Sequence, residues 1–318
     1  MSRSVFPLLL LALLCVFPFL AESAGLGFYV SFVRRVLIFA LAATSLSLIV
    51  GFGGMVALGH AAFIGLGAYA VVVMAEMGYY SAVVVWPVAM LSAALFALLT
   101  GAVSLRTKGV YFIMITLAFA QMAYYIFISL RQFGGEDGVS LYQLSELPFL
   151  NLYDEFSFYY VVLAIVVAFM LVFNVVISSR FGTALQGIRE NETRMAALGY
   201  PVYAIKLIAY VLSGTALGLA GALLANHNQF VSPSLMHWTQ SANLLIMVLV
   251  GGLGLRWAGV FGATLLLVLE EFLRMWTDYW HLPLGVLLLC VVFFAPNGLA
   301  AIRWTKVSAN KQAGVRHG

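Results

Sequence analysis

The sequence predicts an all-α integral membrane protein, a polytopic bundle of about nine or ten transmembrane helices, some of them broken at glycines. Hydrophobic residues make up 64% of its 318 residues, charged residues make up 9%, and the mean hydropathy is +1.04. A soluble domain of this length could not cover so much apolar surface. Apolar runs of about 17 to 25 residues, long enough to cross the hydrocarbon core, recur along the chain. They lack the alternation of barrel strands, so we expect helices.

The apolar runs place the expected elements in order. We expect spanning helices near 5–21, 33–50, 60–78, 82–104, 109–130, 157–177 and 205–226, then a split region at 239–276 and a last span at 283–301. A turn at 251–256 divides the split region into two crossings or a re-entrant pair. Cys15 and Cys290 both lie inside apolar runs, so we expect them to be packing residues and neither disulfide partners nor metal ligands.

The first span has two interpretations. A positive charge, an apolar stretch and small residues before position 24 are typical of a secretory signal peptide. A retained helix is favoured, because the rest of the chain is itself an insertion signal. We therefore divide the chain into a first transmembrane helix or signal-like segment at 1–24, a transmembrane domain at 25–302 and a basic tail at 303–318.

The basic residues predict the orientation, because they accumulate in short loops on the cytoplasmic side. Three basic segments are assigned to the cytoplasm: the turn at 106–108, the polar loop at 178–206 and the tail at 303–318. The acidic connection at 131–156 then falls outside. Arg34 and Arg35 are one exception to this count. The cations flank membrane spans and do not line a soluble face, which indicates no nucleic-acid role.

The polar loop at 178–206 is too long for a simple turn and has a helical pattern. It predicts a docking helix.

Glycines interrupt the apolar sequence at 51–60 and again at 251–262. Paired glycine-broken segments in the two halves of a transporter indicate discontinuous helices whose exposed amide ends can meet an anionic group. The alternative is close packing of helices through small residues, which we favour for the glycines at 214–221. His60 closes the first interruption, and it is either a hydrogen-bonded structural residue or a proton relay.

The motifs that the chain lacks restrict its chemistry. It contains no phosphate-binding loop, no HExxH pair and no CxxC, so we expect no catalytic residue, no cofactor and no metal site. The acidic residues lie in loops or near predicted helix ends, which argues against an ion-coupled secondary transporter. An intramembrane enzyme would need a nucleophile and a base or a metal cluster at membrane depth, and none is visible.

Residues 54–69, GMVALGHAAFIGLGAY, resemble the signature G-x-x-S-L-G-H-A-A-F-x-G-x-G-A-Y of the LivM-type permeases. These are membrane subunits of ATP-driven importers for branched-chain amino acids and their relatives. Residues 182–206 are similar to the cytoplasmic coupling loop of that family, which implies one short coupling helix from about Thr183 to Leu198. Gly199 would end this helix, and Pro201 would prevent its continuation. Further matches lie at 105–112, 134–138, 250–254 and 296–299, so the resemblance runs from about residue 33 to residue 302. One departure is Met55-Val56-Ala57, where Gln-Val-Ser or Gln-Leu-Ser is usual. It leaves the solute open, since the family extends to urea, amide and aromatic-acid importers.

The resemblance implies a permease subunit of an ATP-binding cassette importer in the inner membrane of a prokaryote, with a cytoplasmic C-terminus. It would move branched-chain amino acids or related small polar solutes by alternating access. The implied partners are a second, LivH-like permease subunit, two cytoplasmic ATPase subunits and an external solute-binding protein. An ion-coupled secondary transporter of small solutes is the alternative from another class.

Three groups of site residues follow from the glycine breaks, the polar groups and the resemblance. The expected substrate path comprises Gly53, Gly54, Leu58, His60, Thr116 and Gln121. The expected ATPase-coupling residues are Arg189, Glu190, Glu192, Arg194, Ala196, Ala197 and Gly199. The expected outer gate or binding-protein contact comprises Gly134, Gly135, Glu136 and Asp137.

Overall fold

The computed structural model describes residues 5–23, 25, 27–148, 150–277, 279 and 281–294, and the tail at 303–318 lies outside the described residues. In their described residues the predicted apolar runs form helices, and the end of the last run, 295–301, lies outside those residues. The helices are α1 (Val5–Ser23), α2 (Gly27–Ser47), α3 (His60–Glu76), α4 (Ala82–Ser104), α5 (Val110–Ser129), α6 (Glu155–Ser178), α9 (Val202–Asn228), α10 (Trp238–Gly251), α11 (Ala258–Trp276) and α12 (His281–Phe294). Shorter elements join them: η1 (Leu48–Phe52), η2 (Arg131–Phe133), β1 (Val139–Ser140), α7 (Arg180–Glu190), α8 (Glu192–Ala197), β2 (Phe230–Val231) and η3 (Pro233–Met236). The prediction of an all-α polytopic membrane protein is confirmed.

Five helical segments of the described chain are long and apolar enough to cross a membrane: Gly27–Phe52, Ala82–Ser104, Val110–Ser129, Glu155–Ser178 and Val202–Asn228. Three further apolar helices are shorter, at Leu11–Ser23, His60–Glu76 and Trp238–Gly251. A continuous helix satisfies its own backbone groups, which is why long apolar runs take this form in lipid. How many of the remaining helices cross the bilayer stays a prediction.

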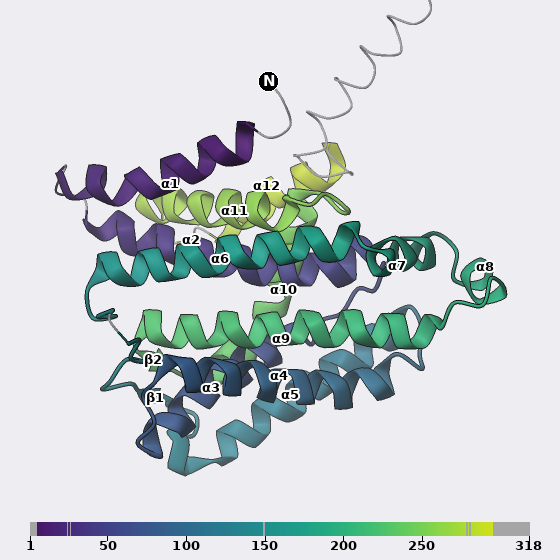
Figure 1. Ribbon diagram of the computed structural model, residues 1–318, viewed down its shortest axis with the longest axis horizontal. Coiled ribbons are helices and arrows are strands. Elements are labelled where there is room, and N and C mark those ends of the chain that lie inside the picture. The colour runs from purple at the N-terminus through teal and green to yellow at the C-terminus, as the bar shows by residue number, and fades with distance from the viewer. Residues whose placement is uncertain are drawn as a thin grey trace, which may run out of the picture.

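The bundle has two distinct ends. α2, α6 and α9 run lengthwise, with α7 and α8 at one end and the β1–β2 pair at the other (Figure 1). In the most apolar stretches of α2 and α9, 89% and 67% of the residues are buried, against 22% in α5. α9 packs on α2, α3 and α4. The core therefore lies along α2 and α9, and α5 presents most of its surface outward.

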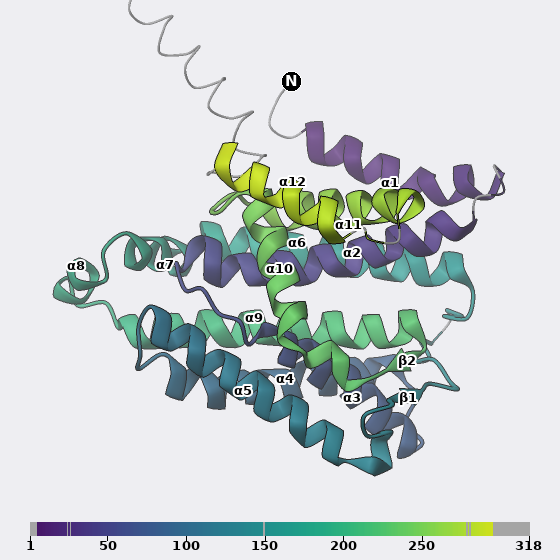
Figure 2. The ribbon, with the colours of Figure 1, turned by 180° about the vertical axis from the view of Figure 1, so that it is seen from behind.

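The split region is two helices, as predicted. α10 ends at Gly251, α11 begins at Ala258, and residues 252–257 form the break between them. α10 is steeply inclined to the lengthwise helices and links the α3–α5 group to the α2–α11 group (Figure 2). The break at 252–257 thereby comes to lie beside the end of α2, where Gly254 packs on Gly51.

The polar loop forms two helices, so the prediction of one helix from Thr183 to Leu198 is wrong. Asn191 separates α7 from α8 because its backbone is extended, with φ −157° and ψ 100°, and its side-chain oxygen accepts a hydrogen bond from the Arg194 amide at 2.8 Å. This is an N-cap, which starts a new helix in a different direction.

The predicted end of the loop helix at Gly199 is confirmed. Gly199 has a φ of +86°, and the amides of Gly199 and Tyr200 donate to the carbonyls of Ala196 and Met195. This is the hydrogen-bond pattern of a Schellman motif, in which a left-handed residue after the helix is usually glycine. Pro201 then caps the start of α9.

Arg34 did not fit the predicted orientation, and its burial explains why. It is only 6% exposed, and its Nε donates to His227 Nδ1 at 3.0 Å. Its guanidinium also lies 4.6 Å from the centre of the Phe158 ring. A cation held by three helices of the bundle is a packing element, so it carries little information about the side of the membrane.

The contact between α3 and α9 depends on glycines. A β-carbon on Gly67 would overlap the backbone of Gly218, and one on Gly221 would overlap the carbonyl of Ile64. Backbones this close gain dispersion contacts along the crossing, which is how membrane helices associate without a hydrophobic driving force. The preference for packing over function at 214–221 fits this geometry.

We expect Gly67→Ala to destabilise the protein by at least about 1–3 kcal/mol, the usual cost of overpacking, because the obstacle is backbone and cannot rotate away. The measurement is the temperature of half-unfolding in detergent. Gly27→Ala is the matched control, since a β-carbon there meets nothing within 4 Å. Equal unfolding temperatures for the two variants would show that the crossing tolerates the extra carbon.

Candidate functional site

Segments far apart in the sequence meet at the α7–α8 end around a cavity of about 240 Å³. They are the loop at 54–59, the α4–α5 turn at 105–109, the start of α8 at Glu192 and the first turn of α9 at Lys206. The cavity thus adjoins both a predicted glycine break and the predicted coupling loop.

The first break begins with a widened helical turn. The Gly53 amide donates to the Leu48 carbonyl at 3.1 Å and the Met55 amide donates to the Ile49 carbonyl at 3.0 Å, so the last turn of α2 is a π-turn. Such turns are often found at functional sites. The chain is then irregular until α3 begins at His60. The predicted interruption of the apolar span is therefore present, with Gly53 and Gly54 at its start.

Thr116 holds the end of this loop. Its hydroxyl accepts a hydrogen bond from the Leu58 amide at 3.4 Å and donates to the Ile113 carbonyl at 2.9 Å. Thr116 is 1% exposed, and a β-carbon on Gly59 would lie 2.5 Å from its carbonyl oxygen. The structure therefore brings Thr116 together with Leu58.

His60 is fully buried at the start of α3. The rings of Phe63 and Tyr210 meet the imidazole edge-on, with centroid distances of 5.4 and 5.6 Å. Neither ring nitrogen makes a well-aligned hydrogen bond among the described residues, although the Ala57 backbone lies close enough to interact with the ring. Whether His60 is a structural residue or a proton relay stays a prediction. The next amide, of Ala61, donates to the Ser241 hydroxyl at 2.8 Å.

Gln121 lies apart from the other predicted path residues. Five residues along a helix turn the direction by about 140°, so Gln121 and Thr116 point to different sides of α5. Gln121 lines an open groove with Met122, Tyr125 and Ile126, and its Nε2 is buried without a partner in the described part of the chain. The structure does not bring it to the loop at 54–59.

Arg189 is an exposed residue whose guanidinium reaches the bundle. Its Nη1 donates a hydrogen bond to the Gly51 carbonyl. A β-carbon on Gly54 would lie 2.9 Å from the Arg189 Cγ, and one on Gly254 would lie 3.0 Å from Nη1. Thus α7 is in contact with both glycine breaks.

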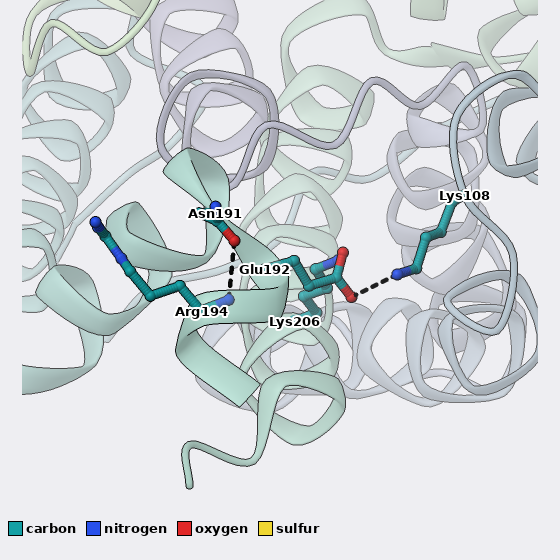
Figure 3. A network of polar contacts seen from close by, with 5 residues as sticks. All are labelled: Lys108, Asn191, Glu192, Arg194 and Lys206. Carbon is teal, nitrogen blue, oxygen red and sulfur yellow. Dashed lines mark hydrogen bonds and ion pairs between the residues drawn. The ribbon is translucent and has the colours of Figure 1, made fainter. Parts of the chain in front are cut away.

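Glu192 is held between two lysines (Figure 3). Its carboxylate lies 2.9 Å from Lys206 Nζ and 3.2 Å from Lys108 Nζ. Partial burial acts to raise the pKa of Glu192, but the hydrogen bonds and charges of Lys206 and Lys108 outweigh it and bring the pKa below its usual value. The carboxylate therefore ties α8 to α9 and to the α4–α5 turn.

In the α7–α8 tip, which is α8 and the residues on either side of it, Met195 is buried, and several other side chains point outward. Glu190 and Arg194 form an exposed ion pair at 3.5 Å. Ala196, Ala197 and Gly199 are exposed, and Leu198 is 67% exposed. An exposed leucine beside small residues gives the tip an apolar surface with a charged rim.

The third predicted group lies at the opposite end. Gly134 and Gly135 turn the chain after η2, and Glu136 and Asp137 are exposed. β1 then pairs antiparallel with β2, with Val139 opposite Val231. This places the acidic turn beside the exit of α9.

Sequence reasoning missed the partners that fix these residues. Lys108 and Lys206 were assigned only to topology, although both bind Glu192. Ser241 was overlooked, and the available signal was a small polar residue in an apolar run. Its hydroxyl accepts a hydrogen bond from the Ala61 amide at the start of α3. The two residues are 180 apart in the sequence, so no local pattern predicts this contact.

Comparison with known proteins identifies the family. The chain is 29% identical to the high-affinity branched-chain amino acid transport system permease protein LivM of Escherichia coli (strain K12), over 94% of the chain and 75% of that protein. It is 28% identical to the protein of the same description from Salmonella typhimurium (strain LT2), with the same coverage. No solved structure matches the chain. The family described as "Branched-chain amino acid transport system / permease component" matches residues 28–294, and the chain belongs to this family.

Proposed function

We propose that this permease subunit of an ATP-binding cassette importer moves branched-chain amino acids, or closely related small polar solutes, across the inner membrane of a prokaryote. Two cytoplasmic ATPase subunits drive it, a second permease subunit completes the pathway and an external binding protein delivers the solute. The family and the printed descriptions of the relatives support the cargo. The mechanism rests on one observation: Arg189, in α7, contacts both glycine breaks.

The α7–α8 tip is the proposed ATPase-docking surface. Ala196, Ala197 and Gly199 leave the short helix narrow, and Leu198 supplies an apolar side chain for a cleft. Glu190 and Arg194 offer one charge of each sign at the rim. Arg189 and Glu192 were expected to contact the ATPase, but their side chains are engaged within the chain. We therefore assign them to passing the displacement inward.

Displacement of α8 has two routes into the bundle. Glu192 connects α8 to α9 through Lys206 and to the turn before α5 through Lys108. α9 packs along α3 and α4, so a tilt of α9 changes the position of the helix that starts at His60. This arrangement suits alternating access, in which a packed group of helices moves as one body around a fixed site.

The proposed solute path passes the loop at 54–59. Gly53, Gly54 and Leu58 supply backbone there, and His60 begins a helix whose amide end favours a carboxylate. Thr116 holds the loop in place. Gln121 lies across α5, the helix with the most outward surface, and we assign it to the seam with the second permease subunit.

At the opposite end, the turn from Gly134 to Asp137 is the proposed contact for the binding protein. Its acidic side chains are exposed, and the turn is joined to the exit of α9 through the β1–β2 pair. Docking of the binding protein at this turn would therefore act on α9, the same helix that the ATPase moves from the opposite end.

The ion-coupled alternative finds no support in the placement of Glu270. This carboxylate lies inside α11 and is only 12% exposed, but it is 2.9 Å from Arg274 and 4.0 Å from Arg35. A carboxylate that contacts two arginines is occupied as a structural ion-pair partner and does not offer an open ion-binding site. Urea, amides and aromatic acids stay alternatives for the cargo, to be separated by direct measurement.

Reconstitution with the partner subunits and binding protein tests the function. We expect uptake of leucine, isoleucine or valine into proteoliposomes that contain ATP, and no uptake without ATP or with a non-hydrolysable analogue. Dissipating the proton and sodium gradients should leave the uptake unchanged. Uptake that persists without ATP would falsify the importer, whereas ATP-driven uptake of urea or an aromatic acid alone would replace only the cargo.

The docking surface is tested by neutralising both rim charges together, Glu190→Gln with Arg194→Gln. The net charge is unchanged, so loss of the two contacts alone should weaken binding. Each rim contact at a protein interface contributes about 0.5–1 kcal/mol, so loss of both should weaken association with the ATPase about five- to thirtyfold. The measurement is the dissociation constant in detergent. Glu76→Gln with Arg131→Gln, at the opposite end, is the matched control; equal affinities for both double variants would remove the rim charges from the docking surface.

The Glu192 ion pairs predict a pH dependence. The folded-state pKa lies below the unfolded value, so the stabilisation is fully present above the unfolded value and is lost as the pH falls through the folded one. Glu192→Gln should cost about 0.5–1 kcal/mol at neutral pH, as expected for a partly exposed pair. Melting temperatures of parent and variant should converge as the buffer is taken down to about pH 3. Glu76→Gln is the control. The ion-pair role of Glu192 would be contradicted if the difference in melting temperature stayed constant over this pH range, or if Glu76→Gln showed the same pH-dependent difference.

A further inference from the structure

One guanidinium lies where the two glycine breaks meet. Arg189 Nη1 donates to the carbonyl of Gly51, in the π-turn that ends α2. The same nitrogen lies beside Gly254, in the break between α10 and α11. Gly51 and Gly254 are themselves packed, since a β-carbon on Gly51 would lie 3.0 Å from the Gly254 amide nitrogen. The breaks in the two halves of the chain therefore share a single side chain.

Gly54 leaves room for the Arg189 side chain, because it has no side chain of its own. The Cγ of Arg189 crosses directly over Gly54, where a β-carbon would approach to 2.9 Å. Gly54 also has a φ of +67°, a conformation that side chains other than glycine's rarely adopt. The loop at this point is therefore shaped to the stem of the arginine.

The electrostatics favour a cation at this position. Gly51 lies in the last turn of α2 with its π-turn, and Gly254 follows the end of α10 at Gly251 by three residues, so Arg189 contacts the chain near two helix C-termini. The carbonyl groups at a helix C-terminus carry partial negative charge. A guanidinium has five N–H donors in a planar fork, so it can serve two loops at once. A lysine in its place has one compact ammonium at the end of a flexible stem.

We propose that Arg189 is a positioning residue that holds both glycine breaks together, and that withdrawing it releases them in one step. It stands in the last turn of α7, two residues before Asn191, which separates α7 from α8. Movement of α7 draws the guanidinium away from Gly51 and Gly254, and the two broken segments then separate. The source of that movement, ATPase closure, rests on the proposed function; the clamp itself does not.

We call this role of Arg189, holding the two glycine breaks together, the clamp. It is tested first in the subunit without its partners, in lipid nanodiscs, by hydrogen exchange of backbone amides in the two breaks. Four amides there donate to backbone carbonyls and report opening: Gly53 and Met55 in one break, Gly252 and Leu255 in the other. In Arg189→Ala we expect both pairs to exchange at least about tenfold faster, since opening of either break then lacks the common restraint. Arg189→Lys should lie between the parent and the alanine variant.

Arg180→Gln is the matched control, because it removes one charge from the same helix about 13 Å away from Arg189 along the axis. It should leave the exchange of all four amides unchanged. Faster exchange in one break only, or in neither, overturns the clamp. If Arg189→Ala gives no folded protein, Arg189→Lys decides alone: unchanged exchange in both breaks overturns the proposal.

The second test uses the complex with its ATPases, second permease subunit and binding protein. A merely structural role would lower assembly or ATP hydrolysis together with uptake. For Arg189→Ala we expect assembly and hydrolysis within about twofold of the parent and uptake per ATP lowered at least about tenfold, the scale of a lost coupling energy. An unchanged ratio of uptake to hydrolysis overturns the clamp. A parent complex that transports without ATP overturns the proposed function and leaves the exchange result intact.

Discussion

Every peptide group that a membrane-spanning helix frees needs a partner inside the protein, because the hydrocarbon core supplies none. The interruption between α2 and α3 depends on this constraint. Partners for it come from separate parts of the chain: the carbonyls of Leu48 and Ile49, the hydroxyls of Thr116 and Ser241, and the guanidinium of Arg189. Because α5, α7 and α10 each supply one of them, the position of this loop reports the position of all three helices.

The same constraint explains why the charged groups concentrate at the α7–α8 end. There the break, the turn before α5 and the start of α9 come within reach of one short polar segment. Glu192 and Arg189 flank Asn191, so the joint between the two short helices is fixed on both sides. α8 combines an inward ion-pair network with an outward apolar tip, which suits a part that receives force from a partner.

Local patterns in the sequence predict the helices well, because apolar length alone determines a span in lipid. The break at 51–60, the split near residue 251 and the end at Gly199 were predicted for the same reason, since glycine acts through the backbone next to it. The joint at Asn191 was missed because an N-cap inside a helical pattern is a weak signal. The Arg189–Gly51 contact joins residues 138 apart, and the role of Arg34 as a buried packing element depends on three helices. Such contacts are properties of the assembled bundle and leave no trace in a local pattern.

The position of α9 has a consequence for biosynthesis. Both α3 and α4 pack against the glycines of α9, which leaves the ribosome roughly a hundred residues after α4. During that interval α3 and α4 have each other, α5 and the lipid as neighbours, and α2 lacks its contacts with α9. We therefore expect the early helices to be incompletely packed in the membrane until α9 is inserted, and the bundle to close when α9 packs against them. Folding of this protein is then a late, cooperative step, and an interruption of translation before residue 202 would leave a product that quality-control proteases can recognise.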